Sequence, residues 1–221
     1  MNYIQIAIDG PAGAGKSTVA KLLSKRLDFI YIDTGAMYRA ITLKAINMKV
    51  DLNEEDQFDF LEQTSFTYTG STLLMDGKDI SGAIRGNEVS SNVSMVSSHY
   101  CVREKLVDIQ QQMAKNRSVV MDGRDIGYVV LPDAKYKYYV TASIKERASR
   151  RYKDNLNRGI KGDLDAIEKD IERRDYLDQT RAHNPLKPAE DAIIIDTSDL
   201  SITQVVEFIA KKIREGENHG F

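Results

Sequence analysis

Residues 10–17 read GPAGAGKS, between the apolar run YIQIAID of residues 3–9 and a stretch, residues 16–27, whose apolar residues recur at helical spacing. Glycines in such a turn direct backbone N–H groups towards a phosphate, and the start of the helix adds partial positive charge. In this pattern the lysine reaches the β and γ phosphates of a nucleotide, and the next hydroxyl ligates magnesium. The sequence therefore predicts a strand, a phosphate loop (residues 10–17) and a helix. The predicted nucleotide contacts are Gly10, Pro11, Ala12, Gly13, Ala14, Gly15, Lys16, Ser17 and Thr18.

The alternation of strand and helix continues along the chain. Apolar, β-branched runs predict further strands at residues 29–33, 118–122, 136–141 and 192–196. Apolar residues at helical spacing predict helices at residues 36–46, 89–115 and 164–180, and after residues 143 and 201. The last two are opened by the capping-box pairs Ser143 with Glu146 and Ser201 with Gln204. Such alternation favours a parallel sheet with helices on both faces, so we expect a three-layer α/β fold with a five-stranded parallel sheet.

The alternation is interrupted between about residues 51 and 87. A short helix is predicted at residues 54–63, and the runs FTYT (66–69) and LLMD (73–76) then alternate in polarity. Asp76-Gly77 is a pair typical of hairpin turns. This stretch predicts a small antiparallel β insertion in the α/β core.

Composition limits where the protein works and what it binds. The 221 residues, 42% hydrophobic and 29% charged, suffice for one folded domain with an insertion. No apolar run approaches the roughly 20 residues that span a bilayer, and the opening residues resemble no secretory leader. The single cysteine, Cys101, excludes an intramolecular disulfide and a multi-cysteine zinc site. We expect a cytoplasmic protein with no membrane partner, in which oxygen atoms bind any metal.

Charge is nearly balanced overall but concentrated locally. The chain has 31 Lys and Arg against 33 Asp and Glu, which does not favour a nucleic-acid partner. Half of the 14 arginines nevertheless fall within 35 residues, namely Arg147, Arg150, Arg151, Arg158, Arg173, Arg174 and Arg181. Because guanidinium groups bind phosphate in a bidentate manner, this concentration indicates a small, highly charged anion as the ligand.

A phosphate loop alone occurs in GTPase switches, motor ATPases and small-molecule kinases. The sequence has no N-K-x-D segment of the kind that selects guanine, and 221 residues are few for a motor ATPase module. Kinases of small molecules or nucleotides remain.

Two further segments carry a more specific signal. DTGAMYR (33–39) resembles the element by which nucleoside monophosphate kinases hold the acceptor phosphate. DGRDIG (122–127), with Arg174, Asp178 and Arg181, is similar to the bacterial cytidylate kinases, and the similarity covers almost the whole chain, including an insertion of about 40 residues. The resemblance implies a P-loop, adenylate-kinase-like fold and Mg²⁺-dependent transfer of the γ-phosphoryl group of ATP to CMP and dCMP.

The resemblance also implies roles for individual residues. The implied acceptor contacts are Thr34, Arg39, Ser94, Arg103, Arg124, Asp125, Arg174, Asp178 and Arg181. The implied catalytic residues are Lys16, Arg124, Arg147, Arg151 and Arg181, with Arg150 and Arg158 as further ATP contacts. The implied regions are a core (about 1–34, 88–142 and 163–221), a nucleoside-monophosphate-binding region with the β insertion (35–87) and a mobile lid (143–162).

The choice of base follows from hydrogen-bond patterns. Cytosine presents an amino donor beside two acceptors, so a carboxylate with a guanidinium is complementary, whereas uracil would leave both mispaired. The resemblance assigns these groups to Asp125 and Arg103, with Ser94 as a third contact. From the sequence alone, several neighbouring serines fit the place of Ser94 equally well. A kinase of UMP or AMP is the nearest alternative, and a nucleotide-dependent switch is an alternative from another class.

Metal binding and assembly complete the expectations. Ser17 is predicted to ligate Mg²⁺, and Asp33 or Asp122, each at the end of a core strand, to order its bound water. We expect a monomer without an obligate protein partner.

Overall fold

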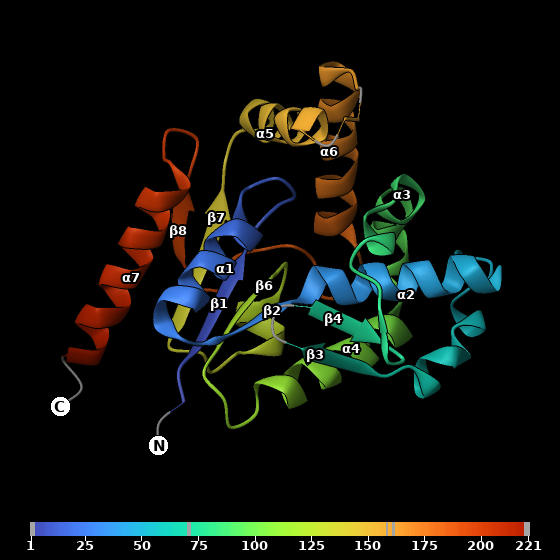
Figure 1. Cartoon of the computed structure of the whole chain (residues 1–221), viewed down its shortest axis with the longest axis horizontal. Coiled ribbons are helices and arrows are strands. Elements are labelled where there is room, and N and C mark those ends of the chain that lie inside the picture. Colours follow the sequence, from blue (N-terminus) through green and yellow to red (C-terminus); the bar gives the residue numbers. More distant parts are fainter. Residues whose placement is uncertain (1–2, 70–71, 158, 161, 219–221) are drawn as a thin grey trace.

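The computed structural model describes residues 3–69, 72–157, 159–160 and 162–218, and it contains the predicted parallel sheet (Figure 1). Its five strands are β1 (Gln5–Asp9), β2 (Ile30–Asp33), β6 (Val119–Gly123), β7 (Tyr136–Thr141) and β8 (Ile193–Asp196). They lie in the order β2-β6-β1-β7-β8, and every neighbouring pair is parallel. All five carboxyl ends therefore meet at one edge of the sheet.

Helices cover both faces of this sheet. Ile6 and Ile8 of β1 pack on one face with α1 (Lys16–Leu27) and α7 (Ile202–Asn218). Ala7 between them packs on the other face with Ala114 of α4 (Tyr100–Ala114) and with η4 (Ile126–Val130), one turn of π helix. The alternation of side chains along the strand thus divides the core into two layers of contact, which confirms the three-layer fold.

The predicted β insertion forms a small antiparallel sheet of β3 (Phe66–Thr69), β4 (Thr72–Met75) and β5 (Lys78–Asp79). Asp76 and Gly77, both with positive φ, make the turn between β4 and β5. The small sheet shares a hydrophobic cluster with α2 (Thr34–Met48), α3 (Asn87–Val96) and α4. The helix predicted at 54–63 is instead two 3₁₀ turns, η1 (Glu55–Gln57) and η2 (Asp59–Gln63), and a third, η3 (Ala83–Arg85), precedes α3.

The single helix predicted for residues 89–115 is wrong, because the chain breaks between α3 and α4. The Ser97 and Ser98 hydroxyls donate to the carbonyls of Ser94 and Met95 at 3.0 and 2.6 Å. Such local bonds compete with helix continuation. His99 is then extended, and α4 begins at Tyr100.

At the carboxyl ends of the strands lie α5 (Ile144–Asn157) and α6 (Leu164–Thr180), at the top of Figure 1. The Ser201 capping box is complete, because Ser201 and Gln204 each accept the other's backbone N–H. The Ser143 box is half formed: Ser143 accepts from the Glu146 N–H at 3.2 Å, but the Glu146 carboxylate accepts from Arg150. Within the described residues, no helix has the length and apolarity to cross a bilayer.

Candidate active site

A cleft of about 1040 Å³ opens where the parallel strands end. Its walls come from the phosphate loop, α2, α3, α5 and α6, and the volume is at the upper end for small-molecule sites. The basic residues that line it are Lys16, Arg39, Arg85, Arg103, Arg124, Arg150, Arg151, Arg174 and Arg181. The fold therefore brings together basic side chains from seven separate parts of the chain, namely the start of α1, α2, η3, α4, the turn after β6, α5 and α6.

The phosphate loop joins β1 to α1, as predicted. Gly10 has φ 145°, and a Cβ there would lie 1.9 Å from the Val140 carbonyl oxygen, so only glycine fits. The Lys16 ammonium donates to the Pro11 carbonyl at 2.7 Å. Burial and the neighbouring Arg124 guanidinium lower the pKa of Lys16, so an anion in the cleft would favour its charged form.

Not every loop residue faces the cleft. The residues that line it are Ala12, Gly13, Gly15, Lys16, Ser17 and Thr18. Gly10, Pro11 and Ala14 are buried behind them. In the described structure a nucleotide could therefore contact these three predicted residues only through their backbone atoms.

The two carboxylates predicted near magnesium have different surroundings. Asp122 Oδ2 accepts from the Ser17 hydroxyl at 2.7 Å, and its Oδ1 accepts from the Tyr31 hydroxyl at 2.9 Å. Burial and the nearby Asp33 raise the pKa of Asp122 to about 6. Asp33 instead caps α2 through the Ala36 N–H at 2.8 Å. The Ser17 and Asp122 oxygens thus form a pair suited to a hard cation, whereas Asp33 stabilises a helix end.

The predicted acceptor element is held at the start of α2. Arg39 pairs with Asp33 at 3.1 Å, and Thr34 donates to the Asp122 carbonyl at 2.7 Å. The Tyr68 hydroxyl of the small sheet donates to the Asp33 carbonyl at 3.0 Å. The small sheet therefore supports the segment that carries Thr34 and Arg39.

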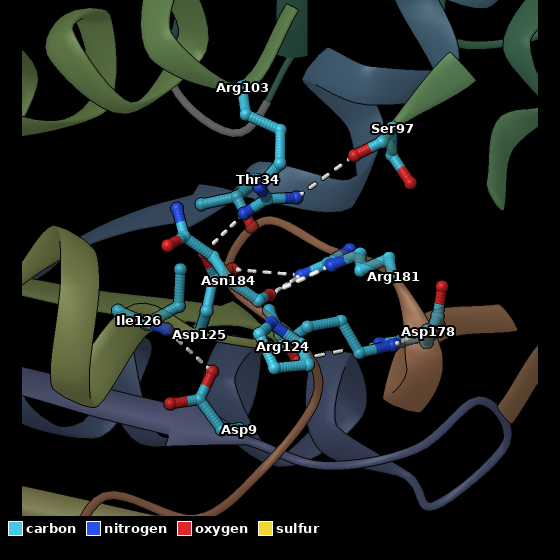
Figure 2. A network of polar contacts seen from close by, with 12 residues as sticks. Asp9, Thr34, Ser97, Arg103, Arg124, Asp125, Ile126, Asp178, Arg181 and Asn184 are labelled. Carbon is cyan, nitrogen blue, oxygen red and sulfur yellow. Dashed lines mark hydrogen bonds and ion pairs between the residues drawn. The ribbon is translucent and has the colours of Figure 1, made fainter. Parts of the chain in front are cut away.

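The two residues predicted to read the base lie in direct contact (Figure 2). Arg103, only 1% exposed, donates to Asp125 Oδ2, and Arg181 lies 3.7 Å from Asp125 Oδ1. Arg103 also donates to the Ser97 carbonyl at 3.1 Å, so the break between α3 and α4 supplies one of its partners. Ser94 is buried and lines the cleft nearby.

Two arginine nitrogens remain unsatisfied. The Nε atoms of Arg103 and Arg174 are buried and have no hydrogen-bond partner among the described residues. Burial and Arg124 lower the pKa of Arg174 to about 10. Arg124 itself donates to Asp178 at 2.8 Å. A buried donor without a partner is costly, so these two nitrogens are suited to a polar ligand or an ordered water.

The predicted lid arginines fall into different environments. Arg150 donates to the Thr197 hydroxyl and carbonyl at 3.0 and 2.6 Å, and Arg151 lines the cleft one residue later. Arg147, by contrast, is 4% exposed and turned under the phosphate loop, where it donates to the Ala12 carbonyl at 2.9 Å. A catalytic residue is expected at the cleft surface, but Arg147 lies away from it because the buried carboxylate of Asp175 holds its guanidinium. The prediction for Arg158 lies outside the described residues.

Three residues that organise the site were missed. Asp9 accepts from two backbone N–H groups behind Asp125, Asp175 pairs with Arg147 at 2.6 Å, and Thr197 holds Arg150. Only Asp9 gave a signal in the sequence, as a carboxylate that ends an apolar strand just before the phosphate loop. Arg85, exposed on the cleft wall, was also not predicted.

Comparison with known proteins supplies an independent result. The sequence model of a family described as cytidylate kinase matches residues 6–215. A cytidylate kinase from Geobacillus sp. (strain WCH70) is 49% identical over 219 residues, with 97% of this chain and 98% of that protein covered. One from Streptococcus gordonii (strain Challis) is 50% identical over 221 residues, with the same coverage. A crystal structure of an uncharacterized protein from Eubacterium ventriosum ATCC 27560 has TM-score 0.55 at 12% identity, covering 97% of this chain and 99% of that chain, a likeness of fold.

Proposed function

Because the chain belongs to the cytidylate kinase family, whose members are ATP-dependent phosphotransferases, we propose that it transfers the γ-phosphoryl group of ATP to CMP and dCMP. The observation that carries this proposal is the presence of two separate sets of phosphate-binding groups in one cleft. The phosphate loop with Lys16 forms one set, and Arg39, Arg124 and Arg181 form the other. A nucleotide switch would need only the first set.

The donor nucleotide binds along the phosphate loop. Backbone N–H groups of residues 12–17 and the start of α1 receive its phosphates, and Lys16 exchanges the Pro11 carbonyl for phosphate oxygens. Arg151 stabilises the charge on the transferring group, and Arg150 lies beside it at the Thr197 end of the cleft. The attacking phosphate oxygen is already ionised near neutral pH, so positioning and charge neutralisation supply the catalysis and no side chain acts as a strong base.

The acceptor binds between α2, α3 and α6. Arg39, Arg124 and Arg181, which line the cleft, receive its phosphate, and the family resemblance assigns the sugar to Arg174 and Asp178. The Asp125 carboxylate accepts from the cytosine amino group, and Arg103, which lines the cleft beside it, donates to the acceptor edge of the base. Ser94 adds a contact from α3. The same pair would face mismatched groups on uracil, which supports cytosine as the base.

Magnesium fits the oxygen pair of Ser17 and Asp122. Ser17 would ligate the ion, and Asp122 would hold its bound water, with Asp33 occupied at the end of α2. When bound, Mg²⁺ neutralises charge on the phosphate oxygens of ATP. The 2.7 Å hydrogen bond between the two residues would have to open to admit it.

A lid closes over the bound nucleotides, because an open site would let water take the phosphoryl group. The first turns of α5 are tied to the core by Ser143, Arg147 and Arg150, which bond to Ser198, Ala12 and Thr197. The moving part of the predicted lid would therefore lie beyond Arg150. A smaller radius of gyration in small-angle scattering with a bisubstrate analogue would support this, and identical profiles would refute it.

The oligomeric state and the cellular location are the last parts of the proposal. The whole cleft is built from one chain, so we propose that the protein acts as a monomer, which size-exclusion chromatography with light scattering tests. The single cysteine favours the cytoplasm.

The experiment that tests the function is an ADP-release assay with ATP and Mg²⁺ and with CMP, dCMP, UMP, AMP and GMP in separate reactions. Turnover with CMP and dCMP well above the others is expected. Preference for UMP or AMP would keep the reaction and refute the base pocket. Absence of turnover with every monophosphate would refute the kinase and favour a nucleotide switch.

A further inference from the structure

The proposed reaction gives no role to Asp9, a buried carboxylate next to the site. Asp9 is the last residue of β1, immediately before the phosphate loop, and only 3% of it is exposed. Its Oδ1 accepts from the Ile126 N–H and its Oδ2 from the Gly127 N–H, both at 2.8 Å. Figure 2 shows it below the turn that carries Arg124 and Asp125.

The two N–H groups are the first ones of η4, and Asp125 is the residue that precedes this turn. An aspartate in that position ordinarily folds its side chain back to accept from the N–H of the second or third residue of the turn, here Gly127 or Tyr128. In the described structure Asp125 makes no such bond. Its oxygens face Arg103 and Arg181 in the cleft instead.

Asp125 cannot serve both purposes, because its carboxylate would have to turn away from the cleft to cap η4. Arg103 would then lose an anionic partner in a buried position. Asp9 supplies the cap from β1 and satisfies the N–H groups of Ile126 and Gly127, including one of the two that Asp125 would otherwise bind. We propose that Asp9 is a positioning residue that caps η4 in place of Asp125 and so keeps the Asp125 carboxylate available to read the base, an inference that rests on the proposed function.

The surroundings of Asp9 make this cap rigid. Asp9 is paired in register with Gly123 of β6 and Tyr139 of β7, so its backbone is held on both sides. A Cβ at Gly127 would lie only 3.3 Å from Asp9 Oδ2, so glycine at this position lets the carboxylate approach the start of η4 closely. The residue after Asp9 is Gly10, so one strand end positions both the donor loop and the base-reading carboxylate.

The proposal predicts that removing the Asp9 carboxylate imitates loss of Asp125. The measurement is kcat/KM for CMP and for UMP at saturating ATP, for wild type, Asp9→Ala, Asp125→Ala and the double variant. Asp9→Ala should lower the preference for CMP over UMP by about tenfold or more, mainly through KM for CMP. In the double variant the Asp9 substitution should change the preference no further, because Asp125 has no carboxylate left to misdirect.

Asp9→Asn is a smaller perturbation of the same cap. The amide oxygen can accept from one N–H group, but the amide nitrogen is a donor and cannot accept from the other. This variant should give an intermediate loss of preference. Asp191→Asn is the matched control, because that exposed carboxylate pairs with Lys137 near η4 but outside the cleft, and it should keep the wild-type preference. The ratio of kcat/KM for CMP to that for UMP does not depend on the fraction of folded enzyme. A less stable variant therefore still gives a valid measure of base preference.

The outcomes distinguish failure of the proposed function from failure of the positioning role of Asp9. Wild type that does not phosphorylate CMP refutes the proposed function itself. Wild type that is active, with Asp9 variants that lose CMP and UMP turnover in equal proportion, refutes the positioning role. Additive losses of preference from Asp9→Ala and Asp125→Ala would also refute it.

Discussion

Replacing Arg147 by methionine would strand a buried carboxylate beneath the phosphate loop. Arg147 Nη1 lies 2.6 Å from Asp175 Oδ2 and donates to the Ala12 carbonyl at 2.9 Å, and its Nε donates to the Ala142 carbonyl at 2.9 Å. Asp175 Oδ1 in turn accepts from the Ala12 N–H at 3.4 Å. The pair therefore holds both backbone groups of Ala12 and ties α5 and α6 to the loop.

The expected cost follows from burial. Breaking a buried pair by removing one partner typically costs about 3–5 kcal/mol, because the remaining charge is left without compensation. For a chain of this size each kcal/mol corresponds to a Tm shift of roughly 2–4 °C, so Arg147→Met should lower Tm by roughly 6–20 °C. Adding Asp175→Asn should recover most of that loss, since it removes the stranded charge while the amide oxygen can still accept from Ala12.

In the double variant, stability should be largely restored while activity stays low. In the double variant the Ala12 carbonyl still lacks its donor, so the loop is less well held, and kcat/KM for ATP should fall by about tenfold to a hundredfold. Thermal unfolding and steady-state kinetics measure the two effects. Arg173→Met is the matched control, because Arg173 is half exposed and pairs with Asp170 at the surface, and its stability should change by less than about 0.5 kcal/mol.

Two results would refute this reasoning. Arg147→Met that is as stable as Arg173→Met would mean that the buried pair contributes nothing. Asp175→Asn that worsens Arg147→Met would mean that the stranded charge is not the cause of the loss.

Three further predictions concern the cleft. Lys16→Ala should lower kcat by at least about a hundredfold, since it removes charge beside the transferring group; near-normal turnover in the ADP-release assay would contradict this. Asp122→Asn should raise the Mg²⁺ concentration needed for half-maximal activity, and an unchanged Mg²⁺ titration would argue against the Ser17 and Asp122 site. Burial raises the pKa of Asp9 to about 7, so the folded protein binds a proton that the unfolded chain releases above about pH 4. The free energy of unfolding of wild type, relative to Asp9→Asn, should therefore fall by up to about 1.4 kcal/mol per pH unit between pH 4 and 7, which urea denaturation at several pH values measures.

The parallel sheet could be predicted because its central strands β1 and β6 are buried on both faces. Runs such as those of β1 and β6 are continuously apolar, end in an aspartate and precede a turn, and each predicted strand lies within two residues of the observed one. The break at Ser97 and the turn at η4 could not be predicted in this way. The first depends on side-chain bonds that compete with a helical pattern, and the second on Asp9, a residue far away in sequence.

The phosphate-binding arginines show where a sequence pattern stops being informative. Arg147 and Arg151 are four residues apart on α5 and so share a face of that helix, which makes them equivalent from the sequence. In the structure Arg151 lines the cleft, whereas Arg147 is buried against Asp175 of α6, 28 positions further along the chain. Pairing alone does not make the difference, because Arg124 pairs with the buried Asp178 and still lines the cleft. Arg147 is held away from the cleft, between Asp175 and the carbonyls of Ala12 and Ala142. Assigning phosphate contacts on such a helix therefore requires knowing which groups pack against it.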